Sequence, residues 1–469
     1  MGWRRWLGTG CGWGVVLATV VACEPEPLPP PDDTSTPVGC DRADERIVLT
    51  ASAHLDPTCG YTAGVDITAS GVTLDCQGAT IRSPEGAPGQ GIRIATPVAT
   101  PLADVTVRNC HVVGFLNNLR VTRDGFRTLP AGEEYENGTS DIVIERSTFE
   151  GSRGVGLFVD GYVEGVTIRD NQVRGTGSSG IYLETGSRRS RVENNVIIDN
   201  GFRENGPRWT PFTFAGIDLF FWGVGREGIS VDGSYENTIV GNAFEGNSAG
   251  GILLYKNCGE YPDRPAYFER RYPSEHNLIE GNVFVGGTHG VWVGSRMGEN
   301  TLPMDCTDPA YVDEPVRRVV LDRANDNTIR GNRFHDVTYG IRVEDDGNVV
   351  EANTFTGSGP DRHAVIVGTP LRTTVLDRPV TGTQLIDNVA DIVGNDDPYR
   401  WVTGHEGTVD MGNLANGASA PLCEGIEPPR SPFVFVIAVA AAGPGGEPPA
   451  GPPDQSFPVL GVLPPCPSG

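Results

Sequence analysis

The chain has 469 residues, including 63 Gly, 37 Pro and only four Met. Because Gly and Pro both break helices, this content argues against an α-rich globular enzyme. The formal net charge of −24 argues against a nucleic-acid-binding protein. Apolar residues nevertheless recur in short regular runs, which is not typical of a disordered chain.

Residues 1–22 are typical of an export signal, with Arg4 and Arg5 before an apolar stretch that is too short to span a bilayer. The stretch ends in Val-Val-Ala-Cys at Cys23, which resembles the lipobox of bacterial lipoproteins. That resemblance implies lipid modification of Cys23 and a place at the outer membrane, facing the periplasm or the cell surface. The alternative is an ordinary cleaved signal with a chance cysteine. Residues 23–39 form a Pro-rich linker that would hold a folded body away from the membrane.

Eight cysteines remain after the signal cysteine Cys11 and the candidate anchor Cys23 are set aside. An even count in an exported protein predicts disulfides, although the sequence alone cannot fix their connectivity. We expect pairing between nearest neighbours in the chain. The candidate cysteines are Cys40, Cys59, Cys76, Cys110, Cys258, Cys306, Cys423 and Cys466.

The middle of the chain repeats a template in which Gly-Φ-x-Φ is followed, after a turn, by Φ-x-x-Asn-x-Φ-x-Gly, where Φ is apolar. The template Asn is Asn171, Asn195, Asn242, Asn282, Asn332 and Asn353 in successive copies. The shortest spacing is that of one coil of a β-solenoid, and the internal period of two points alternate residues inward. Asn at a fixed corner can pair its amide with the coils on either side, and Gly allows tight corners.

This pattern resembles the right-handed parallel β-helix, or pectin-lyase-like, family. The resemblance implies an all-β, single-stranded solenoid of about ten coils, with an N-terminal cap and an irregular C-terminal extension. We expect the solenoid with its cap over residues 40–393 and a C-terminal cap with a Pro/Gly-rich tail over 394–469. The apolar run 431–443 in this tail is predicted to be a buried strand. The family scaffold carries many activities, so the fold does not identify the function.

Two outward columns follow from the Gly-Φ-x-Φ strands. The first carries Tyr182, Trp292 and Arg342 and is typical of a sugar-binding platform, because apolar sugar faces stack on aromatic rings. Just past the strands, Asp160, Glu184 and Asp232 fall in neighbouring coils, where they could bind Ca²⁺ or serve as solvated edge charges. We favour the edge charges.

Three insertions, 123–140, 256–277 and 294–326, occupy the same place in the template and should rise from one edge of the rod. A fourth, 201–227, is rich in aromatic residues and lies at the opposite corner. Relatives that act on uronates need a base, a proton donor and a cation for the carboxylate. The candidate catalytic residues are Lys256 (the only lysine), Arg296, Tyr255, His276 and His289, with Arg271 as a further substrate-binding residue.

The sequence therefore predicts an exported, lipid-anchored, monomeric β-helix protein that binds a polysaccharide. It would act as a lyase or C5-epimerase on an acidic glycan. The alternative is a non-catalytic surface protein that binds carbohydrate or has a structural role. An accessory protein for metalloenzyme assembly is a third hypothesis, although the scarcity of His and Met argues against copper handling.

Overall fold

The structure is a computed structural model. It describes residues 30, 34–84, 89–204, 206, 210–214, 217–257, 259–260, 267–294, 299–300, 304–305, 310–314, 317–320, 323–369, 379–402, 407–424 and 436–439. Several residues singled out in the sequence lie outside these ranges: Cys23, Cys258, Arg296, Cys306 and Cys466. In the part of the chain that the structure describes, no helix is long and apolar enough to cross a membrane.

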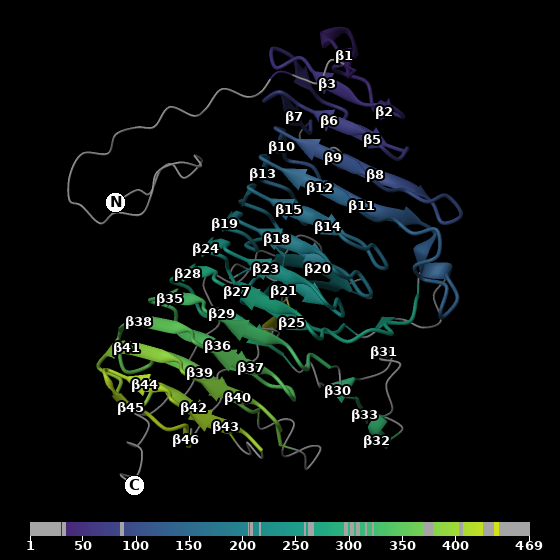
Figure 1. Cartoon of the computed structure of the whole chain (residues 1–469). Helices are drawn as coiled ribbons and strands as arrows, with labels where there is room; N and C mark the ends of the chain where they lie inside the picture. Colours follow the sequence, from purple (N-terminus) through teal and green to yellow (C-terminus); the bar gives the residue numbers. More distant parts are fainter. Residues whose placement is uncertain are drawn as a thin grey trace, which may run out of the picture.

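The described chain winds into a rod whose wall consists of three long sheets with 13 strands each (Figure 1). Successive strands pass from sheet B to sheet A to sheet C and back to sheet B, and neighbouring coils pair in parallel register. Only the last pair of sheet C, β44 and β45, is antiparallel within these three sheets. The expected all-β parallel β-helix is therefore confirmed.

Sheet A consists of β1 (Thr36–Val38), β3 (Ala53–Leu55), β6 (Thr73–Asp75), β9 (Val105–Arg108), β12 (Ile142–Glu145), β15 (Thr167–Arg169), β18 (Arg191–Glu193), β23 (Thr238–Val240), β27 (Leu278–Glu280), β34 (Thr328–Arg330), β37 (Val349–Glu351), β40 (Gln384–Ile386) and β43 (Val409–Met411). Sheet B consists of β2 (Ile47–Leu49), β5 (Val65–Ile67), β8 (Gln90–Pro97), β11 (Asn117–Asp124), β14 (Leu157–Val159), β17 (Ile181–Leu183), β22 (Glu227–Asp232), β25 (Gly250–Tyr255), β29 (His289–Val293), β36 (Tyr339–Val343), β39 (His363–Val367), β42 (Tyr399–Trp401) and β46 (Cys423–Glu424). Sheet C consists of β4 (Gly60–Tyr61), β7 (Thr80–Arg82), β10 (His111–Val113), β13 (Thr148–Glu150), β16 (Gln172–Arg174), β19 (Val196–Ile198), β24 (Ala243–Glu245), β28 (Val283–Val285), β35 (Arg333–His335), β38 (Thr354–Ser358), β41 (Val389–Val393), β44 (Leu414–Ala415) and β45 (Ala418–Ser419).

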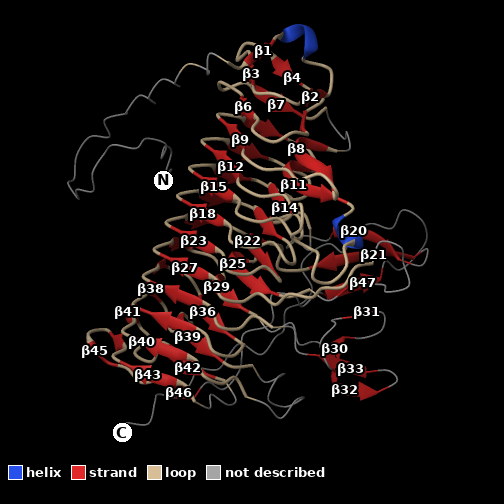
Figure 2. Ribbon diagram, turned by 45° about the vertical axis from the view of Figure 1, so that its right-hand side comes forward, coloured by secondary structure: helices blue, strands red, loops and turns tan. Residues whose placement is uncertain are grey.

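Three small antiparallel sheets lie beside the rod. They are formed by β20 (Thr210–Phe214), β21 (Ile217–Trp222) and β47 (Val436–Val439); by β26 (Gly259–Glu260) and β31 (Met304–Asp305); and by β30 (Glu299–Asn300), β33 (Arg317–Val320) and β32 (Ala310–Glu314). The two described helices are single 3₁₀ turns, η1 (Cys40–Arg42) and η2 (Phe126–Thr128). Figure 2 shows β20, β21 and β47 together at the side of the rod.

A ladder of asparagines runs along the corner between sheets A and C. The template Asn of one coil accepts hydrogen bonds from the backbone N–H and side-chain amide of the Asn in the preceding coil, as at Asn195 and Asn242 (both 2.9 Å). Each ladder residue is buried, and its amide also donates to backbone carbonyls, so the polar groups at the corner are satisfied. The predicted pairing of the asparagine amides between neighbouring coils is therefore confirmed.

The two glycines of the template differ. The last one has a positive φ at its corner, as predicted, at Gly175 (64°) and Gly246 (63°). The glycine of Gly-Φ-x-Φ is required for another reason. A Cβ at Gly290 would lie 2.4 Å from the Phe334 ring, and one at Gly251 would lie 2.5 Å from the Phe284 ring. These rings belong to a stacked column inside the rod, with centroids 4.7 to 4.8 Å apart. Gly is therefore needed there because a core aromatic ring approaches the backbone, not for a left-handed turn.

The solenoid is longer than the repeat template indicated. Its strands begin at Thr36, before the expected start at residue 40, and continue to Cys423–Glu424, past the expected end at 393. The Asn ladder continues from Asn388 to Asn413, although the Gly-Φ-x-Φ pattern is lost there. The expected N-terminal cap around Cys40 and Cys59 is instead part of the first coils.

Two of the predicted disulfides are present, Cys40–Cys59 and Cys76–Cys110. Cys423 is also disulfide-bonded. The run 431–443 contributes strand β47, which pairs with β21 of insertion 201–227.

Candidate functional site

Sheet B is bordered by insertions on both of its long edges. Insertions 123–140, 256–277 and 294–326 each follow a strand of sheet B and precede one of sheet A, whereas 201–227 lies between sheets C and B. Contacts between described residues join two of the insertions, because Arg271 donates to Glu134 at 2.8 Å. The predicted placement of the insertions is therefore confirmed, and sheet B is the face that they surround.

Only the N-terminal part of this face is accessible. In strand register, the central outward residues of sheet B are Val48, Asp66, Arg93, Arg120, Phe158, Tyr182, Ser230, Leu253, Trp292, Arg342, Ile366, Arg400 and Cys423. Val48 is exposed, the next five are half-buried, and all the others are buried. We call Arg93, Arg120, Phe158 and Tyr182 the sheet B track.

The track is built from stacked planar groups. The Arg120 guanidinium lies 5.1 Å from the centre of the Phe158 ring, and that ring stacks on Tyr182 with centroids 5.0 Å apart and planes 11° apart. Such contacts between a cation and a ring face, and between offset rings, are favourable. The Tyr182 hydroxyl donates to Asp232 at 2.6 Å, which fixes the orientation of the ring.

The three predicted acidic residues lie behind the track. All three are buried and bonded to nitrogen donors, so the favoured prediction of solvated edge charges is wrong. Asp160 forms two hydrogen bonds of 2.9 Å with Arg120, and Glu184 accepts one from Arg270 at 3.2 Å. Asp232 accepts two from Asn257, both at 2.6 Å. Guanidinium and amide groups thus stand where a cation would have to bind.

In the described chain, only two groups of three His, Cys, Asp or Glu residues bring their ligand atoms within 4.8 Å of one another. These are Cys40–Asp56–Cys59, whose cysteines form a disulfide, and Glu275–His276–Asp326 at an exposed corner. Asp160, Glu184 and Asp232 do not form such a group. The Ca²⁺ site therefore stays a prediction.

Burial changes the acidity of two groups at the track. Burial, followed by repulsion from the Glu184 carboxylate, raises the pKa of Asp160 to about 7, and Arg120 opposes this only in part. Burial and the Asp232 carboxylate raise the pKa of Tyr182 well above its usual value, so Tyr182 keeps its proton.

Tyr255 and Lys256, two candidate catalytic residues, are buried at the end of β25. The Tyr255 hydroxyl donates to Glu227 at 2.9 Å and accepts from Arg226 at 3.0 Å. Burial raises the pKa of Tyr255, so this side chain is a proton donor rather than a base.

The candidate histidines lie elsewhere. His289 lies beside Gly250 in the neighbouring strand β25. Gly250 is six residues before Lys256, so His289 and Lys256 are roughly 20 Å apart along the strand direction. Its ring nitrogens face the Ala249 carbonyl and Arg342, both at 3.2 Å, and burial lowers its pKa to about 3. His276 is exposed in a turn with φ 55°, just before sheet A.

The remaining substrate-binding candidates divide between core and surface. Trp292 is 0% exposed and Arg342 is 2% exposed, with Arg342 bonded to Glu344 and His289, so neither offers a face to a ligand in this conformation. Arg271 is half-buried between Glu134 and Glu269. Of the predicted residues, the structure brings Tyr182, Asp160, Glu184 and Asp232 together and leaves His276 and His289 apart from them.

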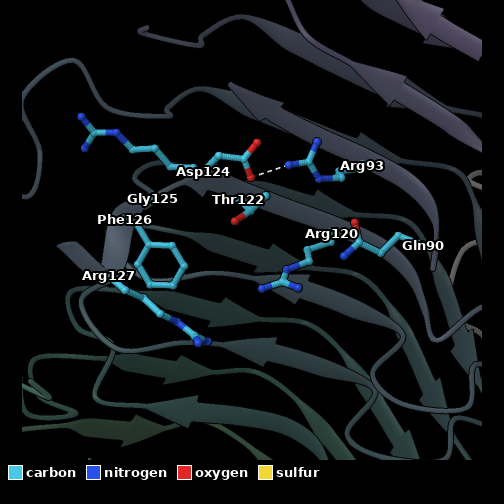
Figure 3. A pocket seen from close by; sticks show the side chains of 9 residues that line it. Gln90, Arg93, Arg120, Thr122, Asp124, Gly125, Phe126 and Arg127 are labelled. Atoms are coloured by element: carbon cyan, nitrogen blue, oxygen red, sulfur yellow. Dashed lines mark hydrogen bonds and ion pairs between the residues drawn. The ribbon is translucent and has the colours of Figure 1, made fainter. Parts of the chain in front are cut away.

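Arg93, Arg120 and Arg127 were missed in the sequence. The signal for Arg93 was present, because residues 91–94 read Gly-Ile-Arg-Ile and match the first half of the template. A cavity of about 320 Å³ opens beside these arginines at the N-terminal end of the track (Figure 3).

Comparison with known proteins agrees with this fold. The sequence model described as the right-handed β-helix region matches residues 63–302, just over half of the chain. The chain belongs to the right-handed β-helix family. No curated protein matches the sequence of this β-helix protein.

Several solved structures resemble this β-helix protein at low identity. The A-module of Azotobacter vinelandii mannuronan C-5 epimerase AlgE4 has a TM-score of 0.48 and 14% identity, covering 83% of this chain and 92% of that one. The tailspike protein of E. coli bacteriophage HK620, in complex with a pentasaccharide, has a TM-score of 0.46 and 11% identity, covering 78% of this chain and 60% of that one. The Streptococcus pneumoniae surface protein and adhesin PfbA has a TM-score of 0.45 and 10% identity, covering 80% of this chain and 91% of that one. These values concern the fold alone and carry no argument about activity.

Proposed function

We propose that this protein binds a polysaccharide along the sheet B track. The observation that carries the proposal is the half-buried, stacked pair of Phe158 and Tyr182 beside Arg120. Apolar faces of sugar rings stack on aromatic rings, while sugar hydroxyls bond to flanking polar groups. In the described strands of sheets A and C, the outward positions carry no Phe, Tyr or Trp, so this feature belongs to sheet B.

The flanking insertions support the same proposal, because long loops on a rigid scaffold are the usual place for binding residues. Export and lipid attachment at Cys23 remain part of it, since a glycan of the cell envelope or its surroundings would then be within reach. The two described disulfides agree with an oxidising compartment.

Lyase or C5-epimerase action on the bound glycan is a second candidate. Asp160 favours it, because this carboxyl with a raised pKa lies directly behind the track and bonds to Arg120, and perturbed pKa values are common at catalytic sites. Against it, Tyr255 and Lys256 are buried, although they lie near Tyr182 and Asp232, and His289 is buried in another part of the sheet. We therefore place non-catalytic binding first. Uronate polymers incubated with the protein would show catalysis as unsaturated products or as a changed epimer ratio.

The test of binding is the variant Phe158→Ala, assayed by calorimetry against a panel of polysaccharides. Loss of the stacking surface should weaken binding about tenfold, which corresponds to about 1.4 kcal/mol. The matched control is Ile198→Ala, a half-buried outward residue on β19 of sheet C. Equal affinities for wild type and Phe158→Ala, with both proteins folded, would contradict the proposal.

A further inference from the structure

The cavity at the N-terminal end of the track is lined mainly by arginines. It lies where β8 and β11 meet the start of insertion 123–140, and Figure 3 shows Arg93, Arg120 and Arg127 arranged around it. The lining residues are Gln90, Arg93, Arg120, Thr122, Arg123, Asp124, Gly125, Phe126 and Arg127. We call this cavity the arginine pocket.

Its positive charge is not balanced by the acids around it. Four arginines line the pocket, while Asp124 pairs with Arg93 and Asp160, behind the track, pairs with Arg120. Arg93 and Arg120 are direct neighbours in strand register, an arrangement in which like charges repel and destabilise a sheet. A concentration of cations in a protein with a net charge of −24 therefore requires an explanation beyond folding.

Arg123 is a buried cation of the pocket wall. It is 2% exposed, and its guanidinium donates to the carbonyls of Glu134 (2.8 Å), Val98 (2.6 Å) and Glu136. Among the described residues it forms no ion pair, and its Nε has no hydrogen-bond acceptor. Burying a charge without a counter-charge is costly, and a bound anion would reduce that cost.

Arg127 is held in place without being neutralised. Its guanidinium lies 5.5 Å from the centre of the Phe126 ring and 5.2 Å from that of Phe268, so two rings position it. It is exposed, and no hydrogen bond or ion pair joins it to any residue within the described ranges. Its hydrogen-bond donors are thus available to a ligand.

We propose that the arginine pocket binds a carboxylate or sulfate group of the glycan that lies along the track, so that the ligand is an acidic polysaccharide. This inference rests on the proposed function and adds the substrate class and the residues that select it. A planar guanidinium matches the paired oxygens of a carboxylate or sulfate. Arg127 contacts the anion directly, Arg93 and Arg120 supply positive charge, and Arg123 holds the wall in position.

The experiment compares each polymer with its uncharged counterpart. The probes are polygalacturonate against its carboxyl-reduced form and dextran sulfate against dextran, with binding measured at low salt. The wild type should bind at least one acidic form about tenfold or more tightly than its neutral form, and salt should reduce the difference. In Arg127→Ala this preference should fall about tenfold, and Arg127→Lys should retain part of it.

Arg82→Ala is the control, because Arg82 is also exposed but lies on β7 of sheet C. It should keep the wild-type preference. Equal binding of acidic and neutral polymers, or an unchanged preference in Arg127→Ala, would overturn the inference while leaving glycan binding intact. Failure of the wild type to bind any polymer would instead overturn the proposed function, and the inference with it.

Discussion

The buried carboxyl of Asp160, behind the track, makes the stability of the fold depend on pH. This carboxyl is fully buried, with Arg120 on one side and Glu184 in the next coil. In the unfolded chain this carboxyl loses its proton near pH 3.8, whereas the fold raises its pKa to about 7. Between these values the folded state binds more protons than the unfolded state. The free energy of unfolding therefore falls as the pH rises from about 4 to about 7 and is level above that.

The first prediction follows for Asp160→Asn, which removes the titrating group and keeps the shape. From pH 4 to pH 8, the Tm of wild type relative to this variant should decline and then level off near pH 7. Thermal unfolding monitored by circular dichroism at each pH measures this. Asp391→Asn, an exposed residue of β41, should follow the wild type. Parallel curves for wild type and Asp160→Asn would contradict the raised pKa.

At the level of single residues, the sequence predicted the structural asparagines better than the site. A second ladder, Asn237–Asn277–Asn327–Asn348, was missed at the corner between sheets B and A. Its signal was present, because each of these residues comes five positions before a template Asn. Burial of Trp292 could not be predicted, since the period of two gives the face on which a side chain lies but not whether other chain segments cover that face.

The insertions are the elements that define the candidate site. Insertion 123–140 is joined to its neighbours by aromatic and polar contacts: the Tyr135 hydroxyl bonds to that of Tyr235 at 2.9 Å, and the Arg188 guanidinium lies 3.5 Å from the centre of the Tyr135 ring. Arg123 fixes its base through three backbone carbonyls. Template position alone predicted the shared edge, but these contacts depend on the conformation of each loop.

The second prediction concerns Arg123→Met, which keeps the length of the side chain but removes its donors. Three carbonyls lose their partner, so the free energy of local opening of residues 125–138 should fall by about 1–3 kcal/mol. Hydrogen exchange should become faster there and stay unchanged in β27 and β34. Arg82→Met is the matched control. Unchanged exchange in the insertion would show that Arg123 does not hold it.

The whole molecule is a stack in which each coil contacts mainly its two neighbours. Stability is then approximately a sum of coil and interface terms, and the ends open first unless they are reinforced. The two described disulfides lie in the first coils, at sequence separations of 19 and 34 residues. They reinforce the end of the rod next to the arginine pocket.

The third prediction is that reduction weakens this end selectively. Chain-entropy arguments give about 3 to 4 kcal/mol for each disulfide of these separations. In a Cys76→Ala/Cys110→Ala variant, hydrogen exchange should accelerate in β6, β7, β9 and β10 and remain slow in β34 and β37. Uniform acceleration along the rod would contradict the one-dimensional description.

At this scale the sequence identified the solenoid but underestimated its length, since thirteen strands per sheet replace about ten expected coils. Strands such as β2 and β11 lack the Gly-Φ-x-Φ pattern, so they do not match the template. They stack nonetheless, because burial of alternate apolar side chains is sufficient to fix their register.

Binding of an acidic glycan along the sheet B track is tested most directly by hydrogen exchange with an acidic oligosaccharide bound at saturation. We expect slower exchange in β8, β11, β14, β17 and insertion 123–140, with little change on sheets A and C. Protection confined to sheets A or C, or to β29, β36 and β39, would contradict this expectation.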